Sequence, residues 1–121
     1  MSFAVDNYFN KKFHPTNYNC WDFIRDVWMD ITKFDIGCRT PNPSTPKNKI
    51  KRFMAEESDF IKVPELVDPC IILFKRNVGI PHVGVYTRGR VLHISEKGVK
   101  FEHLEIAKLG FNDVGFYICK K

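Results

Sequence analysis

The sequence predicts an α+β domain with an antiparallel sheet, because a helical pattern comes first and a series of short strands follows it. Residues 20–33 place apolar side chains at helical spacing. Residues 70–119 alternate short segments rich in Val, Ile and Phe with turn residues. The chain has 121 residues, 44% of them hydrophobic, which is enough for one core. We therefore expect a single domain over 1–121, with residues 1–17 as an N-terminal arm.

The predicted first helix begins after Asn19, a residue that caps helix N-termini well, and Asp22 stands where a capping box places its acid. Four apolar positions follow the i, i+3, i+4, i+7 rule and form one buried stripe. They are Ile24, Val27, Trp28 and Ile31. The helix is expected to end near Lys33, before a loop that carries Gly37.

The remaining elements are placed by turn residues and β-branched runs. A loop over 38–46 is rich in Pro, Ser, Thr and Asn, and a second helix is expected from Thr45, as cap, to about Glu56. Five strands are predicted, at 70–75, 82–87, 90–95, 99–104 and 114–119.

The cysteines are spread singly along the chain, so neither a structural zinc site nor a disulfide framework is expected. Cys70 and Cys119 lie in apolar runs and are interpreted as small buried hydrophobic residues, whereas Cys38, in a loop, is ambiguous. Cys20 differs because it falls in the first helical turn, where the helix dipole and free N–H groups stabilise a thiolate. A thiolate is the nucleophilic form of cysteine. The alternative is a cysteine that only packs under Trp21 and Trp28.

Two histidines are predicted to share one face of a hairpin. The turn at 88–89 would pair Thr87 with Arg90, and the same register would place Gly84 opposite His93. Because side chains alternate with a period of two, His82 and His93 become diagonal neighbours roughly 7–8 Å apart. One imidazole could then orient the other, and Gly84 would leave room for a helix N-terminus. The alternative is a pair of half-buried histidines without a catalytic role.

Charge and hydropathy narrow the classes of partner. The net charge of +5 is compatible with an anionic partner or with ordinary solubility, and the basic residues at 47–52 lack a nucleic-acid-binding signature. The longest apolar run, 70–74, is too short for a transmembrane segment, and residues 1–13 show no signal-peptide core. We therefore expect no transmembrane segment, no nucleic-acid partner and no secretion signal.

Two blocks of sequence resemble the NlpC family of cell-wall cysteine peptidases, and more closely its phage tail-assembly branch. The first block is Asn-Cys-Trp-Asp-Phe at 19–23, and the second is His-Val-Gly-Val-Tyr at 82–86, followed by Val-Leu-His at 91–93. An Ile-Leu-Phe strand at 72–74 and a Gly-Phe-Tyr strand at 115–117 extend the resemblance over roughly residues 17–119.

The resemblance implies a papain-like NlpC fold, with the N-terminal helix that bears the Cys packed on an antiparallel sheet of about five strands. It implies Cys20 as nucleophile, His82 as general base and His93 as orienting residue, with Tyr18 and Trp21 at the substrate. The implied activity is metal-free and cofactor-free hydrolysis of amide bonds beside D-glutamate in peptidoglycan stem peptides. The implied location is a phage tail, made in the bacterial cytoplasm and acting at the cell wall, with other tail-tip proteins as partners.

The chain departs from the family pattern at two places. Asp68-Pro69-Cys70 stands where the family has Pro-Gly-Asp, and Asn17-Tyr18-Asn19 replaces a glycine-rich approach to the cysteine. Other readings stay open: a structural tail-tip protein with little catalysis, an acyl-transfer enzyme using the same Cys–His pair, and a metal site through the two histidines and a cysteine.

Overall fold

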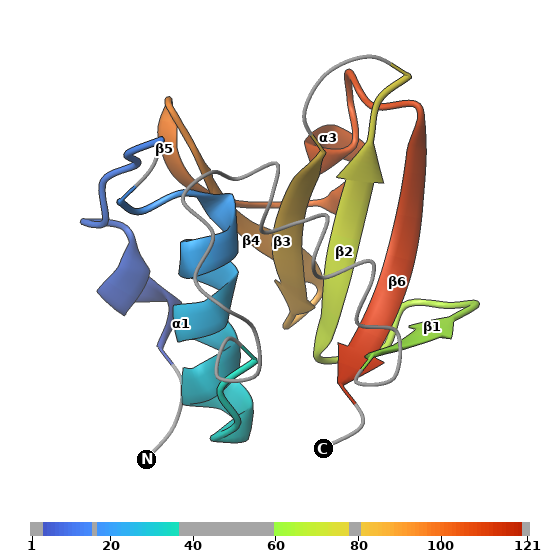
Figure 1. Ribbon diagram of the computed structural model, residues 1–121, viewed down its shortest axis with the longest axis horizontal. Helices are drawn as coiled ribbons and strands as arrows, with labels where there is room; N and C mark the ends of the chain where they lie inside the picture. The colour runs from blue at the N-terminus through green and yellow to red at the C-terminus, as the bar shows by residue number, and fades with distance from the viewer. Residues whose placement is uncertain (1–3, 16, 37–59, 78–80, 120–121) are drawn as a thin grey trace.

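A six-stranded antiparallel sheet makes up most of the computed structural model, which describes residues 4–15, 17–36, 60–77 and 81–119 (Figure 1). The strand order is β1-β6-β2-β3-β4-β5. The strands are β1 Phe60–Val63, β2 Cys70–Lys75, β3 His82–Thr87, β4 Arg90–Ser95, β5 Gly98–Glu102 and β6 Asp113–Cys119. In chain order β2 to β5 form a meander, and β6 returns to lie between β1 and β2.

The main helix, α1 (Cys20–Thr32), begins and ends where local chemistry predicts. The side chain of Asn19 accepts hydrogen bonds from the backbone N–H groups of Trp21 and Asp22, and the Asp22 carboxylate accepts one from the Asn19 N–H. This capping box fixes the first turn. Lys33 follows in the left-handed conformation, with φ of 65°, and stops the helix. The predicted start, cap and end of this helix are confirmed.

Apolar side chains cover both faces of the sheet. On one face the buried stripe of α1 packs over β3 and β4, and the short 3₁₀ helix η1 (Val5–Tyr8) joins it, so the N-terminal arm contributes to the core. On the other face a second cluster lies beneath the one-turn helix α3 (Leu104–Ala107). The two helices lie on either side of the sheet in Figure 1. We call these faces the α1 face and the α3 face.

The β3–β4 hairpin follows the predicted register, with Thr87 opposite Arg90. Arg88 and Gly89 both have positive φ, 54° and 82°, as a two-residue hairpin turn requires. The ladder ends at Val85, so the predicted pairing of Gly84 with His93 is not part of it.

The predicted architecture, a papain-like NlpC fold with the N-terminal Cys helix on a sheet of about five strands, is wrong. The described residues form mainly a six-stranded antiparallel sheet, with a single helix longer than one turn among them. The strand that the sequence did not reveal is β1, which is four residues long and pairs with β6, far along the chain. Pairing between segments so far apart in the chain leaves no short-range pattern in the sequence.

Smaller corrections concern element bounds. The strand predicted at 99–104 is β5, which starts at Gly98 and stops at Glu102 because α3 follows, and β6 starts one residue earlier than predicted. The second helix expected up to Glu56 and the loop at 38–46 lie outside the described residues. In the described part of the chain no helix is long and apolar enough to cross a bilayer.

Candidate active site

His82 and His93 are joined by a hydrogen bond. His82 is the first residue of β3 and His93 lies in β4, and the Nε2 atom of His82 is 2.8 Å from the Nδ1 atom of His93. Gly84 makes this approach possible, because a Cβ at that position would lie 2.9 Å from a methyl of Val91 and 3.1 Å from the Cβ of His93. The sequence predicted that these two histidines share a face, and the structure brings them together.

A third residue, Glu102 of β5, continues the chain of hydrogen bonds. Its Oε2 atom lies 2.6 Å from the Nε2 atom of His93. Sequence reasoning missed Glu102, although a signal was present. The register of β4 and β5 places Lys100 opposite His93, so Glu102, two residues on, is the diagonal neighbour on the same face.

Two aromatic rings pack against the His82 imidazole on the α3 face. The Phe111 ring is stacked on it, with centroids 5.9 Å apart and an interplanar angle of 13°, and the Phe74 ring lies 5.5 Å away. The guanidinium of Arg76 lies over the Phe111 ring. Burial, and secondarily electrostatic repulsion from a protonated His93 and from the Arg76 guanidinium, lower the pKa of His82 to about 3. Burial also lowers the pKa of His93, against the opposing effect of Glu102. Both rings are therefore neutral at pH 7.

Cys20 begins α1 and is buried in the cluster on the α1 face. Backbone N–H groups of Val83, Trp21 and Cys20 itself interact with its sulfur and favour the thiolate, as expected at a helix N-terminus. Burial outweighs them and raises the pKa of the thiol to about 11. The Cys20 thiol is therefore protonated at neutral pH.

The thiol and the imidazole are neighbours without being bonded. The backbone N–H of Val83, one peptide bond from His82, lies near enough to the thiol to favour its charged form. The His82 side chain, however, leaves β3 toward the α3 face, and among the described residues no hydrogen bond joins it to Cys20. The structure thus brings His82, His93 and Glu102 together and places Cys20 beside the backbone of the strand that carries His82.

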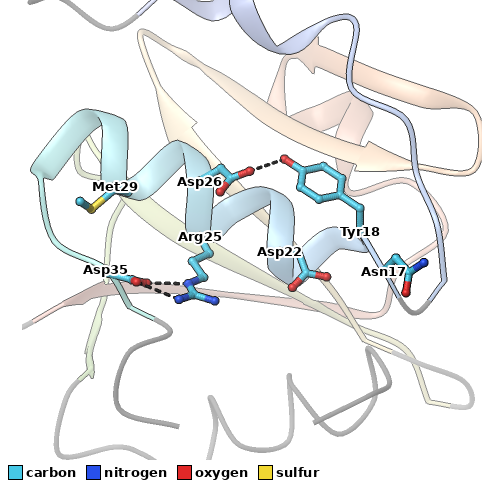
Figure 2. Close-up of a pocket in the computed structure, with 7 residues that line it drawn as sticks. All are labelled: Asn17, Tyr18, Asp22, Arg25, Asp26, Met29 and Asp35. Atoms are coloured by element: carbon cyan, nitrogen blue, oxygen red, sulfur yellow. Dashed lines mark hydrogen bonds and ion pairs between the residues drawn. The ribbon is translucent and has the colours of Figure 1, made fainter. Parts of the chain in front are cut away.

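Tyr18 and Trp21, the residues assigned to substrate contact, lie in different surroundings. Trp21 is 5% exposed and belongs to the core on the α1 face. Tyr18 lies along the outer side of α1, where its hydroxyl donates to an Asp26 carboxylate oxygen at 2.6 Å (Figure 2). Tyr18 borders an open pocket of about 310 Å³. The pocket is lined by Asn17, Tyr18, Asp22, Arg25, Asp26, Met29 and Asp35.

This pocket does not include the thiol or the histidines. Figure 2 shows Arg25 directed toward Asp35, to which it donates two hydrogen bonds of 2.6 and 2.8 Å. Within the described ranges, no group of three or more His, Cys, Asp or Glu side chains could hold a metal ion. Comparison of the chain with models of protein families, with curated proteins and with solved structures finds no match.

Proposed function

We propose that this chain is a cysteine peptidase that hydrolyses amide bonds beside D-glutamate in peptidoglycan stem peptides, the activity of the family that its sequence blocks resemble. The observation that carries the proposal is the hydrogen-bonded series His82–His93–Glu102, which starts on a strand whose next residue, Val83, has its backbone N–H near the Cys20 thiol. A base held in orientation by a second polar group, and a cysteine in the first turn of a helix, are two of the parts that acyl-transfer enzymes use. The sequence blocks around Cys20 and His82 supply the substrate class.

In the proposed reaction the Cys20 proton passes to His82 as the sulfur attacks the amide carbonyl carbon. The amine then leaves with the proton from His82, and water hydrolyses the thioester to release the acid and regenerate the thiol. Before substrate binds, the Cys20 thiol and the His82 imidazole are both neutral. His82 therefore acts as a general base during the attack rather than as half of a preformed ion pair. Because the Cys20 and His82 side chains lie toward opposite faces of the sheet, the proposal requires the start of β3 and of α1 to rearrange so that the sulfur meets the imidazole when substrate binds.

The experiment is hydrolysis of a synthetic stem peptide containing a D-glutamyl amide, followed by mass spectrometry of the products. We expect Cys20→Ala to abolish turnover and to keep the fold, and Cys70→Ala, which alters a buried cysteine of β2, to retain turnover. Full activity in the Cys20→Ala protein would rule the mechanism out.

A second candidate function is favoured by a specific observation. Cys20 is 5% exposed and its thiol is protonated, as expected for a cysteine that packs in the core and does no chemistry. A domain with such a cysteine would serve as a structural tail-tip protein. Tails that carry Cys20→Ala and still assemble and infect normally would favour this function, whereas loss of infectivity with normal assembly would favour the peptidase.

A further inference from the structure

Glu102 lies at the end of the hydrogen-bonded series that runs through His93 to His82. It is the last residue of β5, paired with Val91, and its carboxylate meets His93 at 2.6 Å. The contact is largely shielded from water, since the side chains of His93 and Glu102 are 10% and 22% exposed. A short charge-assisted hydrogen bond in such surroundings is strong.

The positions of the hydrogens on the two imidazole rings follow from which atoms can donate a hydrogen bond and which can only accept one. A carboxylate only accepts, so the Nε2 atom of His93 carries a hydrogen. Burial lowers the pKa of His93 and so favours the neutral ring at pH 7, in which the Nδ1 atom is bare and must accept. The 2.8 Å contact then requires a hydrogen on the Nε2 atom of His82. Since His82 is neutral as well, its Nδ1 atom carries the free lone pair.

The Nδ1 atom of His82 is also the one that remains available. In the described part of the chain nothing hydrogen-bonds to it, and it is not among the fully buried side-chain atoms that lack a partner. Rotation of the ring by half a turn would break the bond to His93, and the rings of Phe74 and Phe111, which also contact each other, pack against the imidazole. The basic atom of His82 is therefore fixed.

We propose that Glu102 is a positioning residue that sets the tautomers of His93 and His82 and thereby makes Nδ1 the basic atom of His82. This inference rests on the proposed function for its catalytic meaning. When His82 takes a proton at Nδ1, its Nε2–H still donates to His93, whose Nε2–H donates to Glu102. The carboxylate then stabilises the positive charge that develops on the imidazole pair, and no atom of Glu102 contacts the substrate.

The direct test is ¹⁵N-resolved NMR of the imidazoles in the wild-type protein and in Glu102→Gln. In the wild type we expect a hydrogen on Nε2 and none on Nδ1 for both His82 and His93. In Glu102→Gln we expect the pKa of His93 to fall, because the carboxylate that favours its charged form is gone. Glu105→Gln is the matched control, since Glu105 is exposed, pairs with Lys108 and should leave both imidazoles unchanged.

Kinetics supply the second readout. With the stem peptide as substrate, Glu102→Gln should lower kcat about 10- to 100-fold, the value of one hydrogen bond to a charged group, with little change in KM. A hydrogen on the Nδ1 atom of His82 in the wild type, or an unchanged pKa of His93 in Glu102→Gln, would overturn the inference. A wild-type protein that cleaves nothing contradicts the proposed function instead, and the NMR measurement still decides the role of Glu102.

Discussion

The reactivity of Cys20 toward a small alkylating agent provides the sharpest test of the resting structure. Burial raises the pKa of this thiol from 9.0 to about 11. At pH 7 the difference corresponds to about 100-fold less thiolate. A more basic thiolate is intrinsically more nucleophilic, which returns a factor of about 6 to 10. The net expectation is alkylation about 10-fold slower than that of an unfolded reference, before any steric protection.

The assay is iodoacetamide labelling between pH 6 and pH 10, with each cysteine followed separately by peptide mass spectrometry. The same protein in denaturant supplies the unfolded reference. Cys70 is the internal comparator, because burial also raises the pKa of its thiol and it lies in β2 opposite Tyr86. We expect the rate at Cys20 to rise steadily across the range.

Labelling of the His82→Ala protein tests whether the His82 imidazole affects the reactivity of Cys20. Since no hydrogen bond joins His82 to Cys20 in the described structure, the substitution should leave the pH dependence at Cys20 unchanged. Rapid labelling at pH 7 with a midpoint below about 8.5, lost in His82→Ala, would refute the reasoning and show a preformed thiolate–imidazolium pair. Unchanged slow labelling would leave general-base catalysis and the structural role as the two possibilities, which Cys20→Ala turnover separates.

Three further predictions concern stability, measured as the free energy of unfolding in urea. Gly84→Ala should cost about 1–3 kcal/mol, because the new Cβ would lie 2.9 Å from a methyl on β4 and 3.1 Å from the Cβ of His93; an unchanged midpoint would contradict the close approach of the strands. Asn19→Ala should cost about 1 kcal/mol through loss of the capping box, whereas Asn10→Ala, at an exposed position, should cost much less. Because the pKa of His82 is lower in the folded state than its usual 6.5, the unfolded chain binds the extra proton, so stability should fall as pH falls from about 6.5 to about 3. The slope from this group is at most about 1.4 kcal/mol per pH unit, and it should be absent in His82→Gln; an equal slope in both proteins would contradict the burial of a neutral ring.

Local features of the fold could be predicted from the sequence because local chemistry determines them. Asn19 and Asp22 fix where α1 begins, and the turn at 88–89 fixes the hairpin register, which in turn places the two histidines on one face. The six-stranded architecture could not be predicted in the same way. It depends on the pairing of β1 with β6, between residues that no short-range pattern connects.

In the candidate site, too, only the contacts that local sequence determines could be predicted. The contact of His82 with His93 follows from alternation on adjacent strands, and Glu102 could have been found by extending that count across the next turn. The relation of Cys20 to His82 depends instead on how α1 docks on the sheet. Docking is set by the whole buried stripe of the helix and by the arm that packs with it, so spacing along the chain does not give it.

The position of β6 between β1 and β2 has a consequence for the order of assembly during synthesis. The strands β2 to β5 pair with sequential neighbours and can form as soon as they are made. Until β6 follows, one edge of β2 stays open, although its residues Ile71–Phe74 become fully buried in the finished sheet, and β1 has no partner. An unpaired apolar edge of this kind invites pairing with another chain. A chain interrupted before β6 should therefore aggregate rather than form a smaller stable sheet.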